Sequence, residues 1–298
     1  MATTSLYQTG PSAFSAAEID LEELFDLKEF PIHDLDHPRR KELVKYCRQG
    51  LDDDGCSHIN GFVRDSALNK MRAEANELTP LAGAAEANHN PYFSSDDPEY
   101  PASHPVRRFT ARTSSFITTD YLQPQSLLRK FYDCDVMVKF LSDCLNSGQI
   151  FRFADPIAAC PYSIMEDGNT FPWHFDGNEF TVTLMIQEAE EGGVFEYCPG
   201  LRTPEDECFE QVQKVLDGDR QAVKQLHLKQ GDLQLFKGRY SMHRVTETRS
   251  KKNRIIAIPS YVTDPYYMNR PKHNLANYGR YLPIHENRDG FRIDSLKD

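Results

Sequence analysis

The sequence lacks the features of a secreted, membrane-spanning or disulfide-bonded protein. No stretch approaches 18 consecutive apolar residues, and no basic segment followed by an apolar one opens the chain, so neither a membrane span nor a secretory signal is expected. The 7 cysteines are odd in number and show no Cys-x-x-Cys spacing, which argues against a disulfide framework or a zinc knuckle. We therefore expect reduced thiols and a cytoplasmic location.

Positive charge is also scarce. The chain has 34 basic and 45 acidic residues, for a net charge of −11, and so no broad cationic surface that would attract a nucleic acid or an anionic membrane. Its 298 residues are enough to bury a substantial core. We expect a small-molecule substrate as partner, with no nucleic acid and no membrane, and the sequence does not determine the oligomeric state.

Helical patterns fill the first half of the chain. A proline near the start and a glycine at the end bound a helix expected over 36–55, and an Asp-Ser pair opens a second one over 62–78. The longest helical pattern covers 123–145. Residues 80–105 are rich in proline and small residues, so we expect a long loop there, of the kind that often contacts substrate in enzymes.

Strand patterns begin near residue 149. Short runs rich in β-branched and aromatic residues, separated by glycine-containing turns, are typical of an antiparallel sandwich or barrel. We expect a helical insertion at 203–228 between two of these strands. The sequence thus predicts an α+β fold in a single domain. Its parts are a mainly helical segment (1–148), a β-core (149–262) and a C-terminal extension (263–298), together making up 1–298.

The stretch "FPWHFDGNEFTVTLMIQ" at 171–187 contains a candidate metal site. Residues two apart in a strand point the same way, so His174 and Asp176 are expected to share a face. By the same parity, that face should include the apolar residues Phe180, Val182, Leu184 and Ile186. We therefore expect the metal-binding pair on the core-facing side of a strand, at the mouth of a barrel.

A third ligand is available in "GDLQLFKGRYSMHRVTET", where His243 opens another expected strand. Two imidazoles and one carboxylate on one face of a metal leave three positions open, which is the facial triad of non-haem Fe(II) oxygenases. Arg254 follows 11 residues later, in the apolar run "RIIAIPSYV". A guanidinium buried there needs an anion, and the far carboxylate of a 2-oxoglutarate chelating the metal would supply it.

These motifs together resemble the Fe(II)/2-oxoglutarate-dependent dioxygenases. The resemblance depends on "HFD" at 174–176, "GDLQLFKGRYSMHRVT" at 231–246 and Arg254, and "EEGGVFEYCPG" at 191–200 is similar to the family's glycine turn into a middle strand. It covers about 149–262. It implies a double-stranded β-helix (a jelly-roll, cupin-like core), Fe(II) as the metal, and 2-oxoglutarate and O2 as co-substrates, with 2-oxoglutarate converted to succinate.

The resemblance also assigns roles to residues. It implies that His174, Asp176 and His243 hold the iron, that Arg254 binds 2-oxoglutarate, and that Tyr162 hydrogen-bonds the same co-substrate. The chain departs from the isopenicillin-synthase-like branch and from the nucleic-acid demethylase branch. The first has a serine where Ile256 stands, and the second has an arginine where Ser260 stands.

The overall pattern is nearer to the oxygenases that modify free amino acids and similar small metabolites in secondary metabolism. That group includes halogenases, in which Gly or Ala replaces the carboxylate ligand to make room for chloride. Because Asp176 is present, we expect an oxygenase outcome rather than halogenation. The expected reaction is hydroxylation, desaturation or oxidative cyclisation of a small polar metabolite, with an amino acid or derivative as the leading candidate.

Candidate substrate contacts are Asn178, Arg108 and Arg239. Each also has an ordinary structural explanation, as a turn cap for Asn178 and as an exposed or ion-paired arginine for the other two. Two other classes of function stay open. One is a jelly-roll metal-dependent hydrolase or isomerase, and the other is a catalytically silent binding protein with the oxygenase fold.

Overall fold

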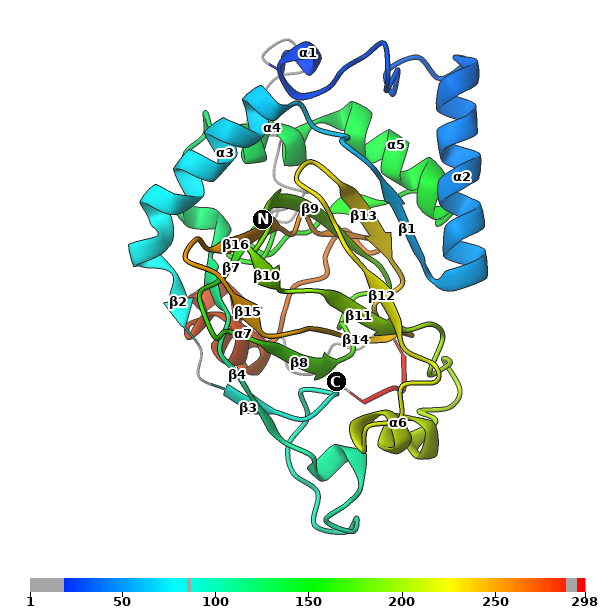
Figure 1. Cartoon of the computed structure of the whole chain (residues 1–298), viewed down its shortest axis with the longest axis vertical. Helices are drawn as coiled ribbons and strands as arrows, with labels where there is room; N and C mark the ends of the chain where they lie inside the picture. Colours follow the sequence, from blue (N-terminus) through cyan, green and yellow to red (C-terminus); the bar gives the residue numbers. More distant parts are fainter. Residues whose placement is uncertain (1–18, 85–86, 288–293, 298) are drawn as a thin grey trace, which may run out of the picture.

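Two antiparallel sheets occupy the centre of the molecule, with helices around them (Figure 1). The computed structural model describes residues 19–84, 87–287 and 294–297. The α-helices are Leu21–Leu24 (α1), Pro38–Asp54 (α2), Asp65–Leu78 (α3), Leu127–Asp133 (α4), Asp135–Leu145 (α5), Phe209–Leu216 (α6) and Pro271–Tyr278 (α7). The strands are Cys56–Ile59 (β1), Gly83–Ala84 (β2), Ala87–His89 (β3), Thr110–Arg112 (β4), Ser115–Ile117 (β5), Phe151–Arg152 (β6), Tyr162–Met165 (β7), Phe171–His174 (β8), Thr181–Gln187 (β9), Glu191–Gly192 (β10), Phe195–Cys198 (β11), Lys224–Leu226 (β12), Leu233–Phe236 (β13), Met242–Val245 (β14), Thr248–Arg249 (β15), Arg254–Ala257 (β16) and Tyr261–Val262 (β17).

The order of the strands places the predicted site residues in two different sheets. The larger sheet has the order β1-β13-β9-β16-β7-β5-β2, and the smaller has β12-β11-β14-β8. In the smaller sheet, the antiparallel register sets His243 directly opposite His174. In the larger sheet, Arg254 lies opposite Met165. Both faces of the cavity described below are therefore built from strands that are far apart in the sequence.

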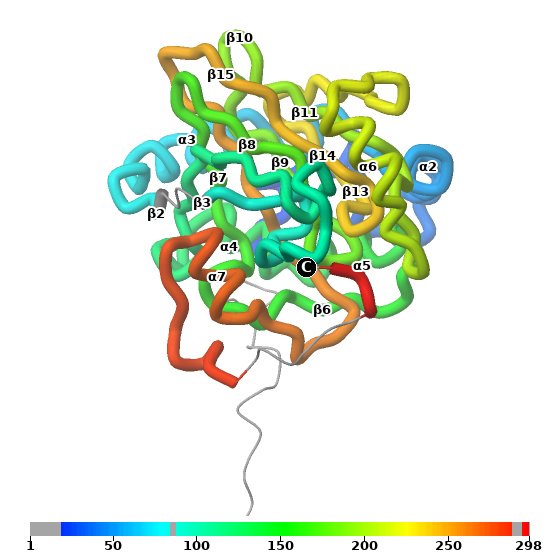
Figure 2. The backbone as a smooth tube through the Cα atoms, turned by 90° about the horizontal axis from the view of Figure 1, so that it is seen from below, coloured from blue at the N-terminus to red at the C-terminus, as the bar shows by residue number. Residues whose placement is uncertain are grey.

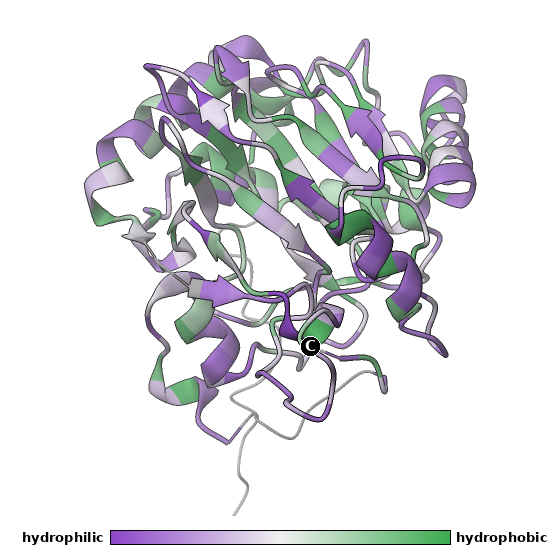
Figure 3. Ribbon diagram, turned by 60° about the horizontal axis from the view of Figure 1, so that its bottom comes forward, coloured by the Kyte–Doolittle hydropathy of each residue, from purple (hydrophilic) through white to green (hydrophobic). Residues whose placement is uncertain are grey.

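The main hydrophobic core lies between the larger sheet and the N-terminal helices. Side chains from α2 to α5 form one buried cluster with Val182, Leu184 and Ile186 of β9. Figure 3 shows hydrophobic residues concentrated in the strands and hydrophilic ones on the outer faces of the helices. Burying a Leu, Ile or Phe side chain contributes ~1.5–3 kcal/mol, so this cluster is the main source of stability for the scaffold.

The helix predictions are confirmed in part. The expected helices at 36–55 and 62–78 correspond to α2 and α3, and α2 ends at Gly55, whose φ of 62° is the left-handed conformation that favours glycine. The single helix expected over 123–145 is wrong, because Cys134 adopts an extended backbone that separates α4 from α5. No helix in the described ranges is long and apolar enough to cross a membrane.

Two expected connections contain more regular structure than the sequence indicates. The loop expected at 80–105 includes β2 and β3, and β3 pairs with β4 outside both main sheets. The insertion expected to be helical at 203–228 contains α6, but it ends in β12, which pairs with β11. Propensity reasoning misses these short strands because each is stabilised by a partner that is distant in the sequence.

The expected continuation of one face from His174 to Ile186 is wrong. Strand β8 ends at His174, and β9 begins at Thr181 in the other sheet. The turn between them breaks the two-residue alternation of side chains, so the face on which a residue of β8 lies does not predict the facing of residues in β9. Val182, Leu184 and Ile186 consequently face the helices, whereas Thr181 and Thr183 of β9 face the cavity.

Candidate metal centre

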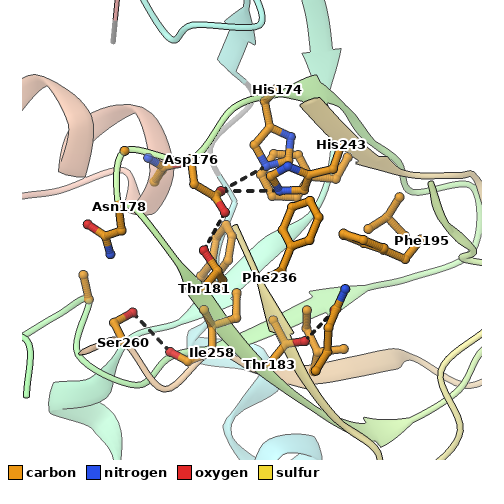
Figure 4. A pocket seen from close by; sticks show the side chains of 18 of the residues that line it. His174, Asp176, Asn178, Thr181, Thr183, Phe195, Phe236, His243, Ile258 and Ser260 are labelled. Atoms are coloured by element: carbon orange, nitrogen blue, oxygen red, sulfur yellow. Dashed lines mark hydrogen bonds and ion pairs between the residues drawn. The ribbon is translucent and has the colours of Figure 1, made fainter. Parts of the chain in front are cut away.

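The two histidines and the aspartate predicted to bind a metal lie together (Figure 4). Nε2 of His174 is 3.6 Å from Oδ1 of Asp176, and Nε2 of His243 is 3.4 Å from the same oxygen. One ligand atom from each residue lies within 4.8 Å of the others. Two imidazoles and a carboxylate at this spacing can hold one divalent ion and leave further positions open.

The backbone fixes the orientation of both imidazoles. Nδ1 of His174 is 2.8 Å from the carbonyl oxygen of Pro172, and Nδ1 of His243 is 3.0 Å from that of Ser241. A carbonyl oxygen only accepts, so each Nδ1 carries the proton and donates it. Each Nε2 is then left with its lone pair directed at the shared site, which is the tautomer that a metal requires.

Asp176 is held in its charged form. Burial alone would raise the pKa of its carboxyl, but the neighbouring His243 and His174 and the hydrogen bonds hold that pKa well below its usual range. One of these hydrogen bonds comes from Oγ1 of Thr181, 2.5 Å from Oδ2. Gly238 makes room for the carboxylate, because a Cβ at this position would lie 1.9 Å from Oδ2 of Asp176.

Arg254 is buried without a counter-charge. Only 2% of it is exposed, and no carboxylate within the described ranges forms an ion pair with it; its Nη1 lies 3.9 Å from Sδ of Met165. Burial lowers the pKa of the guanidinium to about 10. Gly193 leaves space for its side chain, since a Cβ there would lie 2.6 Å from Cδ of Arg254. An uncompensated buried cation is costly, so this position is suited to an anionic ligand.

The three candidate metal ligands and Arg254 line one cavity of about 160 Å³ between the two sheets. Figure 4 shows Thr181, Thr183 and Phe236 facing this space from the larger sheet and Phe195 and the histidines facing it from the smaller one. Four further aromatic rings line it, those of Phe93, Phe116, Phe153 and Phe171.

Helix α7 closes one side of the cavity. It and the residues just before it contribute Asn269, His273, Asn277 and Tyr278 to the lining. Arg112, which is fully buried, anchors the C-terminal end of α7 by donating to the carbonyl oxygens of Ala276 and Asn277 at 2.9 and 3.0 Å. A guanidinium at this end also complements the helix dipole.

Asp155 anchors the N-terminal side of α7. It is completely buried, and its Oδ2 accepts from Nδ2 of Asn274 at 3.0 Å and lies 3.0 Å from Nε2 of His285. Its Oδ1 accepts from two backbone N–H groups, those of Ile157 and Ala158. Burial opposes the charge, but His285 and Asn274 outweigh it and keep the pKa of Asp155 below its usual value.

Replacing Asp155 with alanine should lower the free energy of unfolding by ~3–5 kcal/mol, because the partners of a buried carboxylate are left unsatisfied. Urea-induced unfolding would measure the loss. The matched control is Asp96→Ala, because Asp96 forms an ion pair with Arg107 and is half exposed. Losing this exposed ion pair should lower the free energy of unfolding by at most ~1 kcal/mol. Equal effects of the two substitutions would show that Asp155 does not anchor the C-terminal segment.

The structure brings only some of the predicted co-substrate and substrate residues to the cavity. Asn178 lines it, beside Asp176. The hydroxyl of Tyr162 instead donates to Glu74 at 2.9 Å within the main core. Arg108 pairs with Asp217 at 2.6 Å on the other side of the smaller sheet. Arg239 is buried, pairs with Asp294, and donates to the carbonyl oxygen of Gly177.

Several cavity residues were missed from the sequence. The sequence correctly predicted the strand that contains Thr181 and Thr183. It placed the alternate residues, such as Val182, on the metal-binding face instead of these two threonines. Phe93 lies in the expected loop and has a φ of 54°, a strained conformation for a side chain this large, with its ring 5.6 Å from that of His174. No sequence motif marks the α7 residues as lining the cavity. Helix α7 is held beside the cavity by Arg112 and Asp155, which are distant in the sequence.

The sequence and the fold match known proteins. The family model for HalD (Halogenase D) matches residues 39–277. No curated protein sequence matches the chain. Among solved structures, the non-heme alpha ketoglutarate dependent epimerase SnoN from nogalamycin biosynthesis has a TM-score of 0.54 at 12% identity, covering 74% of this chain and 81% of that one.

Two further structures are similar at a lower score. The carbocyclase SnoK, also from nogalamycin biosynthesis, has a TM-score of 0.50 at 12% identity, covering 77% of this chain and 85% of that one. A prolyl hydroxylase from Trichoplax adhaerens, solved with a peptide fragment of hypoxia inducible factor, has a TM-score of 0.50 at 14% identity, covering 74% and 89%. These likenesses confirm the fold resemblance. Since the family match spans most of the sequence, the chain belongs to the Halogenase D family and has the fold of the 2-oxoglutarate–Fe(II) oxygenases.

Proposed function

We propose that the chain is a non-haem iron oxygenase that couples the decarboxylation of 2-oxoglutarate to the oxidation of a small polar metabolite. The observation that carries this proposal is a shared cavity. His174, Asp176 and His243 line the same space as Arg254, a buried cation with no carboxylate partner among the described residues. A metal site alone fits many enzymes, whereas the added cation calls for a ligand with a carboxylate.

The residues fit the group that the fold family uses. Bound Fe(II) supplies a redox-active ion with open positions for 2-oxoglutarate and O2. Asp176 contributes negative charge to the ion, and the two imidazoles present Nε2 to it. Arg254 binds and orients the far carboxylate of 2-oxoglutarate, and the aromatic walls exclude water. In this proposal the two sheets are the halves of a double-stranded β-helix within the single domain 1–298.

Within its family the chain is proposed to oxygenate rather than halogenate. The family description refers to a halogenase, and a halogenase needs a free metal position where this chain has a carboxylate. Asp176 occupies that position, is charged, and is held by Thr181. The matching space at Gly238 further supports a site built around this carboxylate.

The substrate is proposed to be a small polar metabolite, with an amino acid or derivative retained as the leading candidate. Carboxamide and imidazole groups from Asn178, Asn269, His273 and Asn277 line the cavity beside aromatic rings. Such a wall suits a compact molecule with several hydrogen-bonding groups. A cavity of about 160 Å³ also favours a small molecule over a protein chain. Hydroxylation, desaturation and oxidative cyclisation are all compatible with this site.

An anaerobic titration tests the co-substrate assignment. Adding Fe(II) and then 2-oxoglutarate should give a visible metal-to-ligand charge-transfer band, and admitting O2 should release succinate. A protein that binds zinc for Lewis-acid chemistry would give no such band, and the hydrolase or isomerase alternative would then hold. A band without succinate, even in a screen of candidate metabolites, would favour the silent binding protein.

A further inference from the structure

A second cavity lies behind the two strands that carry the metal-binding histidines. It has a volume of about 350 Å³ and is lined by residues of the β3–β4 connection and the start of β4, of β8 and the residues just before it, of β14, and of the end of α6 and the segment after it. Figure 1 shows α6 beside the end of the small sheet, and Figure 2 shows the same neighbourhood from below. Because neighbouring residues in a strand point to opposite faces, Trp173 faces this cavity while His174 faces the metal centre.

Three guanidinium groups line this second cavity, in a chain whose net charge is −11. They belong to Arg108, Arg220 and Arg244, whose side chains are each about a third or more exposed. Two carboxylates lie against them. Asp217 pairs with Arg108, and the buried Glu196 is shared by the other two, at 2.5 Å from Nη2 of Arg220 and 2.7 Å from Nε of Arg244.

Sharing one carboxylate leaves donors free on both arginines. Among the described residues, Glu196 is the only hydrogen-bonding or ionic partner of the guanidinium groups of Arg220 and Arg244. The guanidinium carbons of the two residues lie 5.7 and 4.9 Å from the ring of Trp173, which holds them at the cavity wall. A planar guanidinium with unused N–H groups is suited to a second, bidentate oxyanion.

We propose that this second cavity binds a small metabolite through a phosphate or carboxylate group held by Arg220 and Arg244. The three guanidinium groups outnumber the two carboxylates that pair with them, and the free donors are suited to an oxygen-rich anion. Thr110 supplies a hydroxyl on the same wall, and Pro91, Pro172 and Trp173 supply apolar surface for the rest of the molecule. This site is separate from the metal cavity and does not depend on the proposed oxygenase activity.

The sole tryptophan of the chain is a built-in reporter for this proposal, because Trp173 lines the cavity. The full-length protein, without added metal, is titrated with inorganic phosphate and separately with succinate, at constant low ionic strength. We expect a saturable change in tryptophan emission with at least one of them, and the one that binds identifies the group. A sodium chloride titration controls for general ionic effects. No saturable change with either anion would overturn the proposal.

Substitutions locate the bound anion. Arg220→Gln should raise the midpoint of the titration about tenfold or more, because charge-assisted hydrogen bonds are lost. Arg244→Gln is a second variant in case the first alters the fold, which the unliganded emission spectrum would reveal. Asp217→Asn should lower the midpoint, since it removes a competing negative charge that is half exposed.

Arg254→Gln separates the two cavities. It should leave the midpoint unchanged if the anion binds beside Trp173. A midpoint that responds to Arg254→Gln and not to Arg220→Gln would place the anion in the metal cavity and overturn the proposal. A midpoint unaffected by Arg220→Gln and Arg244→Gln would do the same.

Discussion

Replacing Asp176 with alanine should abolish Fe(II) binding at the proposed centre and, with it, the release of succinate from 2-oxoglutarate. Asp176 is the only acidic residue in the triad, and its charge compensates that of the metal. Two buried imidazoles without it form a weaker, cationic site once a metal binds. Anaerobic calorimetry with Fe(II), followed by a succinate assay in O2, would measure both losses. An undiminished rate of succinate release would remove Asp176 from the metal site.

The same site can be tested without altering a ligand. Gly238→Ala should displace the Asp176 carboxylate, because the new Cβ would lie 1.9 Å from Oδ2 and 2.7 Å from Cγ. We expect metal affinity to fall by at least about tenfold, since the ligand must move out of its place. The matched control is Gly177→Ala in the adjoining turn, where the nearest atom to a Cβ is 3.8 Å away. Equal metal affinities for both variants would mean that the position of Asp176 is not critical.

Replacing Arg254 with methionine should raise the dissociation constant for 2-oxoglutarate by about thirtyfold or more, because losing one partner of a buried charge-assisted pair costs ~2–5 kcal/mol. A large effect is expected because the Arg254 side chain is almost completely buried, and no other Lys or Arg among the described residues lines the cavity. Calorimetry on the anaerobic Fe(II)-loaded protein would measure it. An unaltered dissociation constant would show that another residue anchors the co-substrate.

The same substitution should have the opposite effect on stability. Without 2-oxoglutarate, the guanidinium of Arg254 is buried with no carboxylate partner among the described residues. An apolar side chain of similar size should therefore raise the free energy of unfolding of the ligand-free protein, by ~1–3 kcal/mol. Urea-induced unfolding with and without 2-oxoglutarate separates the two effects, because the ligand stabilises only a protein that binds it. A loss of stability would indicate a structural rather than a ligand-binding role.

The sequence by itself determined the candidate metal residues and the two cleanest helices. His174 and Asp176 are two apart, and His243 and Arg254 lie at or next to the start of separate strands, so each is recognisable from a local pattern of spacing and alternation. Helices α2 and α3 follow from local capping and stop signals such as Gly55. Local patterns of this kind depend on residues within one or two turns of the chain, and sequence reasoning can read them directly.

Only the tertiary structure decided what surrounds these residues. The turn after His174 passes from one sheet to the other, and it reverses the expected facing of Val182 and Leu184. Arg239 and Arg108, both proposed as substrate contacts, pair with Asp294 and Asp217 instead. These outcomes, like the place of α7 beside the candidate metal centre and the grouping of Arg220 with Arg244 around Trp173, depend on partners tens to more than a hundred residues away. Which of them meet is fixed by the packing of whole sheets and helices.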